Sequence, residues 1–255
     1  MRMENNIKII HWNIASCSID NREKIKDIVY ELEQQEADII VISEATTAQN
    51  EIIEKLMESK REYFTAATNN RNKNGIVIIV SSKKIGSVIF EDFREKQNEI
   101  SPDRLLAKIY LKNGQFFSIL GVRFRVSNLN NSEKEQQFNS FKWEVDQGRP
   151  DIIIGDFNWN TAILPVIRDF KDEIGNRKYK LTYWPTDKEE SECYSYKAKK
   201  GIGYTRPDRV CWNAKNVELV SREYYVGLKE KDEFPVQWPS DHSMIVTTFV
   251  IITKK

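Results

Sequence analysis

Polar side chains able to do chemistry follow several apolar, strand-like segments of this sequence. The clearest case is the segment GDFN at 155–158, which comes directly after the apolar run at 151–154. Side chains two positions apart in a strand share a face, so Asp156 and Asn158 would project together from a strand end, where α/β proteins tend to build their sites. A carboxylate and an amide so placed can hold and deprotonate one water molecule. The alternative is an ordinary turn, because Gly, Asp and Asn all favour turns.

A second polar group, SDHS at 240–243, precedes the last apolar segment of the chain. Its histidine, His242, is one of two in the chain and follows Asp241 directly. An imidazole beside a carboxylate can carry a positive charge or exchange a proton near neutral pH. The alternative is a surface loop histidine without a role.

Three further polar residues lie where apolar segments begin or end. Asn13 ends IKIIHWN, Glu44 ends DIIVISE and Asp208 opens DRVCW. Each one alone could be an ordinary strand terminus, but with the two groups above they would converge on one site. Such a set offers hard oxygen ligands suited to Mg²⁺ or Mn²⁺, with no thiolate and too few histidines for a typical zinc centre.

Alternating apolar and charged segments predict the elements that must position these residues. Nearly continuous, β-branched runs predict strands buried on both faces at 7–14, 37–43, 75–82, 105–111, 116–124, 151–157, 208–212 and 243–252. Helical spacing predicts helices at 21–35, 47–57 and 132–145, with one more short helix within 160–183. We expect Asp20 or Asn21 to cap the first helix, and Ser132 and Glu135 to form a capping box on the third. Strands and helices mix without regular alternation, which predicts a single α/β domain over 1–255.

Composition restricts the class of protein further. The chain has 255 residues, and its 39 Lys and Arg against 38 Asp and Glu give a net charge of +1. This balance excludes binding of nucleic acid through bulk charge alone, so an anionic ligand requires a local basic patch. The 3 cysteines are far apart and suggest neither a disulfide framework nor a thiolate zinc site. The sequence contains no recognisable signal peptide or membrane-spanning segment. We therefore expect a cytoplasmic protein that does not bind a membrane and has no obligate protein partner.

Taken together and in order, these motifs resemble the endonuclease/exonuclease/phosphatase superfamily of metal-dependent phosphoesterases. The resemblance rests on WNI at 12–14, the glutamate after DIIVIS, the glycine-led strand GIVIIVSS, GDFN, R-x-D at 206–208 and SDH at 240–242. It extends from about residue 8 to about residue 249. It implies a four-layer α/β sandwich, in which two mixed β-sheets pack face to face with helices outside and the site lies at the strand ends on one edge.

The resemblance also implies a metal centre. Glu44 would bind the divalent metal, Mg²⁺ or Mn²⁺, with help from Asn13 and Asp241. Ser43 stands where many members have a glutamine before this glutamate. The other histidine, His11, has no role in the family pattern, and we interpret it as a buried structural histidine.

Four catalytic residues follow from the same resemblance. Asp156 would orient or deprotonate the attacking water, and Asn158 would hydrogen-bond water or phosphate. His242, held by Asp208, would face the phosphate and stabilise the negative charge of the transition state.

Arg123 departs from the family pattern, which has His or Tyr at the end of this strand. An arginine can supply a fixed positive charge to a phosphate, but it cannot exchange a proton. We therefore expect an altered rate or substrate preference. The alternative is a solvated arginine at a strand end.

The segment 195–206 is the local basic patch that a neutral protein requires. It carries four basic residues, no acidic residue and two tyrosines, a combination typical of nucleic-acid binding. The alternative is a solvated surface neutralised by the acidic stretch at 186–192. This loop looks most like that of the exonuclease III and apurinic endonuclease branch. The substrate-binding residues that we predict are Arg123, Arg104, Arg206, Tyr196 and Lys199.

These observations predict a divalent-metal-dependent phosphodiester hydrolase, foremost a nuclease acting on DNA or RNA. A phosphatase or phosphodiesterase for inositol phosphates, nucleotides or lipids is the alternative. A catalytically silent binding module on the same fold is the third possibility.

Overall fold

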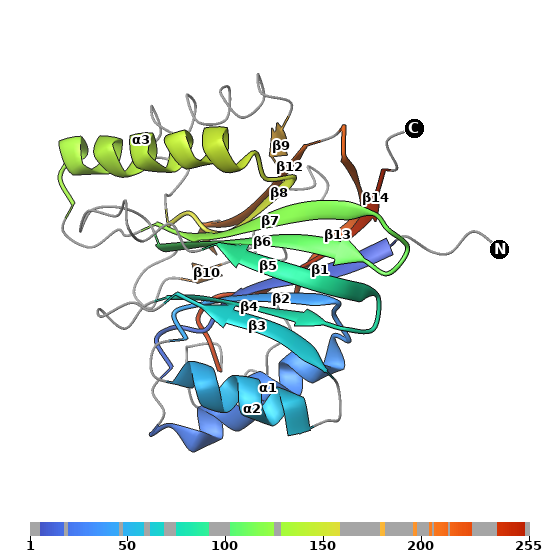
Figure 1. The fold of residues 1–255 in the computed structure, drawn as a ribbon. Coiled ribbons are helices and arrows are strands. Elements are labelled where there is room, and N and C mark those ends of the chain that lie inside the picture. The colour runs from blue at the N-terminus through green and yellow to red at the C-terminus, as the bar shows by residue number, and fades with distance from the viewer. Residues whose placement is uncertain are drawn as a thin grey trace.

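Two six-stranded sheets form the centre of the protein (Figure 1). The structure is a computed structural model, and it describes residues 6–17, 20–45, 48–58, 62–68, 75–91, 103–124, 129–158, 179–181, 196–197, 204–205, 207–213, 215–225 and 239–252.

The first sheet, sheet A, has the strand order β13-β14-β1-β2-β4-β3. Its strands are β1 (Asn6–Asn13), β2 (Ile39–Ser43), β3 (Tyr63–Ala67), β4 (Ile76–Ser81), β13 (Val217–Tyr225) and β14 (Met244–Ile251). The neighbours β1 and β2 are parallel, and every other neighbouring pair in this sheet is antiparallel.

The second sheet, sheet B, repeats this layout in the order β5-β6-β7-β8-β12-β9. Its strands are β5 (Ile85–Glu91), β6 (Asp103–Leu111), β7 (Phe116–Arg123), β8 (Ile152–Asp156), β9 (Tyr179–Leu181) and β12 (Asp208–Asn213). Here β7 and β8 form the parallel pair, and the remaining neighbours are antiparallel. Each sheet therefore has one parallel pair near its centre, flanked on both sides by antiparallel strands. A separate two-stranded ladder joins β10 (Tyr196–Lys197) to β11 (Tyr204–Thr205).

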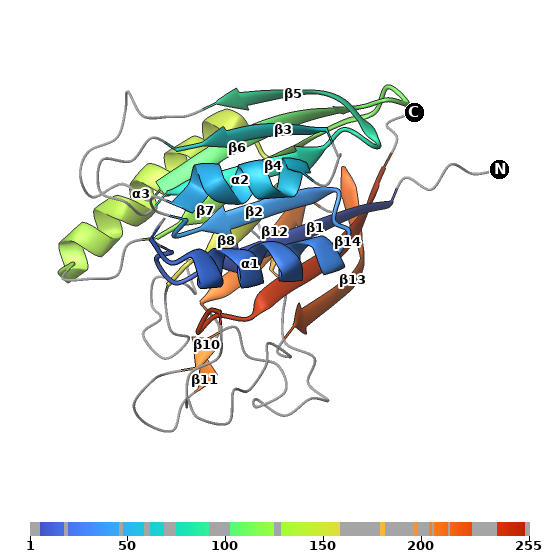
Figure 2. The ribbon, with the colours of Figure 1, turned by 90° about the horizontal axis from the view of Figure 1, so that it is seen from below.

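Helices cover the outer face of each sheet. Helices α1 (Arg22–Gln34) and α2 (Gln49–Glu58) lie on sheet A, and α3 (Asn131–Gly148) lies on sheet B (Figures 1 and 2). The parallel strands require these crossovers, since α1 connects β1 to β2 and α3 connects β7 to β8. The order helix, sheet, sheet, helix confirms the predicted four-layer sandwich.

Three apolar clusters hold these layers together. The largest, which includes Ile9, Val41, Ile78, Ile119 and Ile154, lies between the sheets. A second packs α1 and α2 on sheet A, and a third packs α3 on sheet B. None of the described helices has both the length and the apolar character needed to cross a bilayer.

The first predicted helix and its cap are confirmed, whereas the capping box predicted for the third is wrong. Asn21 caps α1 by accepting a hydrogen bond from the backbone N–H of Lys24. The box on α3 is formed by Asn130 and Glu133, which exchange hydrogen bonds of 3.0 and 2.7 Å. The same x-x-Glu spacing occurs twice within six residues, and the earlier copy starts the helix.

All eight predicted strands are present, but the sheets contain four more. These are β3, β5, β9 and β13, which are the two outermost strands of each sheet. The short helix predicted within 160–183 lies outside the described residues, except that 179–181 form β9.

Glycine at position 155 is required by the pairing of β7 with β8. A Cβ atom on Gly155 would lie 1.8 Å from the carbonyl oxygen of Val122, its partner in the parallel ladder. Replacing Gly155 by alanine must therefore push the two strands apart, directly before Asp156.

We expect Gly155→Ala to lower the free energy of unfolding by about 2 to 3 kcal/mol, measured by urea denaturation. Gly86→Ala is the matched control, because the nearest atom to its added Cβ would lie 3.5 Å away, an ordinary contact. Equal stability of the two variants would contradict this account of the β7–β8 pairing.

Candidate active site

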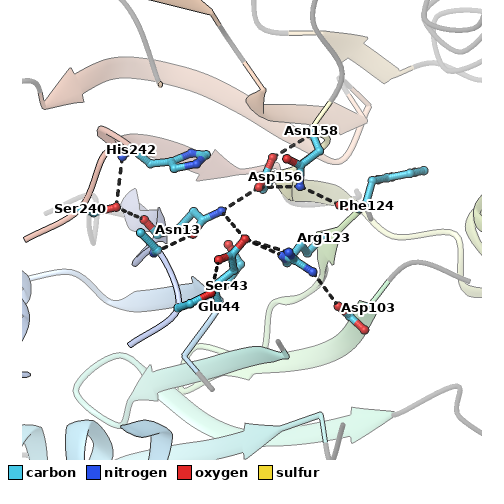
Figure 3. A network of polar contacts seen from close by, with 12 residues as sticks. Asn13, Ser43, Glu44, Asp103, Arg123, Phe124, Asp156, Asn158, Ser240 and His242 are labelled. Atoms are coloured by element: carbon cyan, nitrogen blue, oxygen red, sulfur yellow. Dashed lines mark hydrogen bonds and ion pairs between the residues drawn. The ribbon is translucent and has the colours of Figure 1, made fainter. Parts of the chain in front are cut away.

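The ends of the parallel strands meet at one end of the sandwich (Figure 3). In sheet A, β1 ends in Asn13 and β2 is followed by Glu44; in sheet B, β7 ends in Arg123 and β8 ends in Asp156. Antiparallel neighbours begin at this same end, which adds Asp103, Asp208 and His242. The predicted convergence of polar groups on a strand edge thus brings residues of both sheets together.

Asp156 is fully buried and accepts three hydrogen bonds. Asn13 Nδ2 donates from sheet A at 2.7 Å, and the backbone N–H and side-chain Nδ2 of Asn158 each donate at 2.8 Å. Burial raises the pKa of Asp156 above its ordinary value, and the nearby charge of Asp208 raises it further. A carboxylate held by donors, with a pKa moved toward neutrality, is suited to accept a proton from water.

Asn158 shows that the two interpretations of GDFN, an ordinary turn and a pair of polar side chains that project together, are compatible. Its backbone N–H closes a turn onto Asp156, and its φ angle of 55° lies in the left-handed region that asparagine tolerates. Its side chain also donates to the carbonyl oxygen of Phe124 at 2.7 Å. The turn therefore fixes the orientation of both polar side chains.

His242 and Asp208 form a buried ion pair across the two sheets. Nδ1 of His242 lies 2.7 Å from Oδ2 of Asp208. Burial alone would lower the pKa of His242, but the charge and hydrogen bond of Asp208 raise it to about 9, with Asp156 adding to the effect. The imidazole is therefore cationic at neutral pH. The alternative of a surface loop histidine is wrong, because His242 is 7% exposed.

The backbone around His242 is fixed by residues of sheet A. Trp12 Nε1 donates to the His242 carbonyl oxygen at 3.0 Å. Ser240 Oγ accepts from the His242 backbone N–H at 3.1 Å and donates to the carbonyl oxygen of Asn13 at 2.6 Å. These bonds tie the approach to β14 to the end of β1.

Glu44 and Arg123 form the second ion pair across the sheets. Nε and Nη2 of Arg123 donate to Oε1 of Glu44 at 3.0 and 2.8 Å, and Nη1 donates to Asp103 at 3.3 Å. The Arg123 side chain is 11% exposed, so the alternative of a solvated arginine is wrong. Burial opposes ionisation of Glu44, but the Arg123 charge and the hydrogen bonds from Ser16, Arg123 and Asn13 hold its pKa below the ordinary value.

The backbone of Glu44 is strained, and neighbouring side chains hold it in this conformation. Its φ angle is 60°, in the left-handed region that a glutamate rarely adopts. Ser16, also at positive φ, donates from Oγ to Glu44 Oε2 at 2.8 Å, and Asn13 Nδ2 donates to Oε1 at 3.2 Å. Such strain persists where surrounding contacts determine the conformation, which is common at functional sites.

Two groups of residues could take part in holding a metal ion. Ligand atoms of Asp156, Asp208 and His242 lie within 4.8 Å of one another, although a cationic imidazole is a poor ligand. Of the predicted ligands, Glu44 accepts a hydrogen bond from Asn13 Nδ2, and Asn13 Oδ1 accepts one from the backbone N–H of Ala15. The half-buried Asp241 contributes negative charge beside His242. The Glu44 side chain is 16% exposed, whereas those of Asp156 and Asp208 are fully buried. A hydrated divalent cation can therefore approach Glu44 more easily, and this oxygen-rich set fits Mg²⁺ or Mn²⁺.

Of the predicted substrate-binding residues, Arg123 belongs to this cluster and Arg104 does not. Arg104 is fully buried and shares a strand face with Leu106, which packs under α3, so it points away from Asp103 and the site. Tyr196 begins β10, while Lys199 and Arg206 lie outside the described residues. The hairpin β10–β11 ends three positions before Asp208, which places this basic segment next to the site along the chain.

Sequence reasoning missed four residues that contact the cluster. They are His11, Ser16, Asp103 and Ser240. Asp103 lies two positions before the predicted strand 105–111, and the observed strand β6 begins with it. Ser240 belongs to the SDH motif, but its bond to the Asn13 backbone carries no sequence signal. His11 is fully buried, as we interpreted it.

A comparison with known proteins finds a matching family. A family model described as the endonuclease/exonuclease/phosphatase family matches residues 10–242. No curated protein sequence matches the chain.

Several solved structures share the fold. D. rerio TDP2 complexed with a single-strand DNA product has a TM-score of 0.71 at 16% identity, over 96% of this chain and 98% of that one. The human Nocturnin catalytic domain with bound sulfate has a TM-score of 0.70 at 12% identity, over 97% and 94%. ANGEL2, a 2',3'-cyclic phosphatase, has a TM-score of 0.69 at 14% identity, over 96% and 95%.

The two histidines allow a direct test of the site's electrostatics. In an NMR titration we expect a pKa of about 9 for His242 and about 4 for His11, which burial lowers. In Asp208→Asn the pKa of His242 should fall by about one unit or more, because burial then acts with less opposing charge. The exposed Glu54→Gln is the control and should leave both values unchanged.

Stability should follow the same titration. The pKa of His242 is raised from 6.5 on folding, so its contribution is complete below pH 6.5 and is lost as pH rises through about 9. The free energy of unfolding should fall over this window, and less so in Asp208→Asn. A His242 pKa at or below 6.5 in the unsubstituted protein would contradict the assigned ion pair.

Proposed function

Because the chain belongs to the endonuclease/exonuclease/phosphatase family, we propose that it is a divalent-metal-dependent nuclease that hydrolyses phosphodiester bonds of DNA or RNA. Family members are metal-dependent phosphoesterase hydrolases. One observation carries the proposal: a buried carboxylate able to accept a proton, Asp156, lies beside an imidazolium, His242, at the sheet edge. Hydrolysis of a phosphodiester needs both, one for the water and one for the anionic phosphate.

The metal in this proposal is Mg²⁺ or Mn²⁺, held by Glu44 with Asn13 and Asp241. When bound, such a cation supplies positive charge to a phosphate oxygen. Glu44 is suited to this task because its pKa is held below the ordinary value, so it stays ionised.

Asp156 positions the attacking water and takes its proton. Its donors, Asn13 and the two groups of Asn158, fix the direction of the carboxylate. Asn158 orients the water through its amide oxygen Oδ1, because Nδ2 already donates to Asp156 and Phe124.

His242 donates to the phosphate and opposes the charge that builds up in the transition state. Asp208 keeps the ring protonated and holds its Nδ1, so that Nε2 remains for the substrate. Arg123 adds a fixed positive charge to the same region, held between Glu44 and Asp103.

The proposed substrate class depends on the basic segment 195–206. Tyr196 with Lys197, and Tyr204 with Thr205, form the β10–β11 ladder, which ends three positions before Asp208 in the chain. The complex of D. rerio TDP2 with single-strand DNA supports a nucleic acid on this fold. Basic and aromatic side chains recognise its backbone and bases.

A second candidate is a phosphatase or phosphodiesterase of small phosphorylated molecules. The described cluster provides groups for water, metal and phosphate, and hydrolysis of a small phosphoester needs the same groups. ANGEL2, a 2',3'-cyclic phosphatase, has the same fold.

The deciding experiment incubates the protein with labelled single- and double-stranded DNA and RNA, and with small phosphoesters, in Mg²⁺, Mn²⁺ or EDTA. We expect cleavage of a polynucleotide that EDTA abolishes. Asp156→Asn and His242→Ala should each reduce it by at least about 100-fold, because each removes a group that acts on the reacting atoms. Glu54→Gln, on the exposed face of α2, should retain full activity.

Phosphate release from small molecules with polynucleotides intact would instead establish the second candidate. Binding without turnover under every metal would establish the silent binding module.

Substituting Lys199 and Arg206 by alanine tests the substrate class. We expect KM for a polynucleotide to rise and the salt dependence of binding to weaken by about one ion per lost phosphate contact. The kcat for a small phosphoester should stay unchanged, because the polar cluster is intact. An unchanged KM for the polynucleotide would contradict the role of the basic segment.

A further inference from the structure

The buried carboxylate of Asp208 lies between two imidazole rings. Oδ2 is bonded to Nδ1 of His242 at 2.7 Å, and Oδ1 faces Nδ1 of His11 at 3.5 Å. His11 and Asp208 are fully buried, and His242 nearly so. The second contact is longer than the first, so it is an electrostatic contact rather than a short hydrogen bond.

The surroundings of His11 determine which of its nitrogens carries the proton. The ring is fully buried, which disfavours its charged form, and a neutral imidazole has one donor and one acceptor. An ionised carboxylate only accepts, so the proton lies on Nδ1, facing Asp208. Nε2 must then accept, and the Ser43 hydroxyl, 3.3 Å away and fully buried, is the donor.

These contacts form one buried chain of polar groups, Ser43–His11–Asp208–His242, that crosses from sheet A into sheet B and returns. It begins in the residue before Glu44 and ends at the imidazolium. His11 shares its strand face with Ile7 and Ile9, which belong to the apolar core between the sheets. A histidine here is costly to bury unless both of its nitrogens face polar partners.

We propose that His11 is a positioning residue, which fixes the carboxylate plane of Asp208 and so the orientation of the His242 ring toward the substrate. Loss of the His11 ring removes one of the contacts of Oδ1, so the Asp208 carboxylate gains freedom to rotate about its Cβ–Cγ bond. The direction of Nε2 on His242 then spreads, and its donated bond to a phosphate oxygen weakens. The kinetic part of this inference rests on the proposed function, whereas the structural part does not.

The test compares His11→Leu, His11→Gln and Ile9→Val by NMR of histidine labelled with ¹⁵N, at a pH near neutrality. Leucine keeps the apolar bulk and removes both nitrogens, while glutamine keeps one N–H donor. Ile9→Val is the matched control, since Ile9 is fully buried on the same face of the same strand. In His11→Leu we expect the Nδ1 proton resonance of His242 to move upfield and to exchange faster with solvent. His11→Gln should restore it in part, and Ile9→Val should not move it.

Kinetics provide the second readout once a substrate is identified. His11→Leu should lower kcat about tenfold with KM little changed, and His11→Gln should recover part of the loss. If His11→Leu does not fold, Ser43→Ala replaces it, because this change keeps the ring and removes the donor to Nε2.

An unaltered His242 resonance and an unaltered kcat in His11→Leu, with only stability reduced, would overturn the proposal. A protein that cleaves no phosphoester but shows the expected NMR changes would overturn the proposed function and leave the positioning of Asp208 established.

Discussion

Buried charge at one end of the sandwich is the constraint on which the rest of this structure depends. Asp156, Asp208 and Arg123 belong to sheet B, whereas Asn13, Glu44 and His242 belong to sheet A. Two ion pairs, Glu44–Arg123 and Asp208–His242, each join a charge of one sheet to a charge of the other. A buried charge without its partner costs several kcal/mol. The apolar core between the sheets must therefore close in one register before the polar end can be satisfied.

The interior strands could be predicted from the sequence because both of their faces are buried. Runs such as IIVIS in β2 and IVIIVS in β4 are apolar up to their last residue, a serine, and every residue in them is buried. The outermost strands lack this signal. In β5 and β13, apolar residues alternate with glycine, serine and charged residues because one side and one edge face solvent. Such segments are hard to distinguish from loops without knowing what they pair with.

For the site, residue types could be predicted but not their partners. A polar residue at the end of an apolar run marks a strand end, and this rule found Asn13, Glu44, Asp156 and Asp208. The sequence has no signal for the pairing of Arg123 with Glu44, because the two residues lie on different sheets and are 79 positions apart. The left-handed backbone at Glu44 has no sequence signal either, since glutamate is not a residue that favours it.

The position of β14 in the interior of sheet A has a consequence for folding. Its contacts with β1 join residues that are very distant in the chain, as in the bond from Thr247 Oγ1 to the Ile9 carbonyl, 238 positions apart. Closing so large a loop costs entropy before any contact is gained, and contacts of this kind slow folding. During synthesis β1 must wait, with one edge unpaired, for a strand that the ribosome makes more than 200 residues later. His242 is made just before that strand, so the imidazolium cannot join the carboxylates until this late part of the chain has been made.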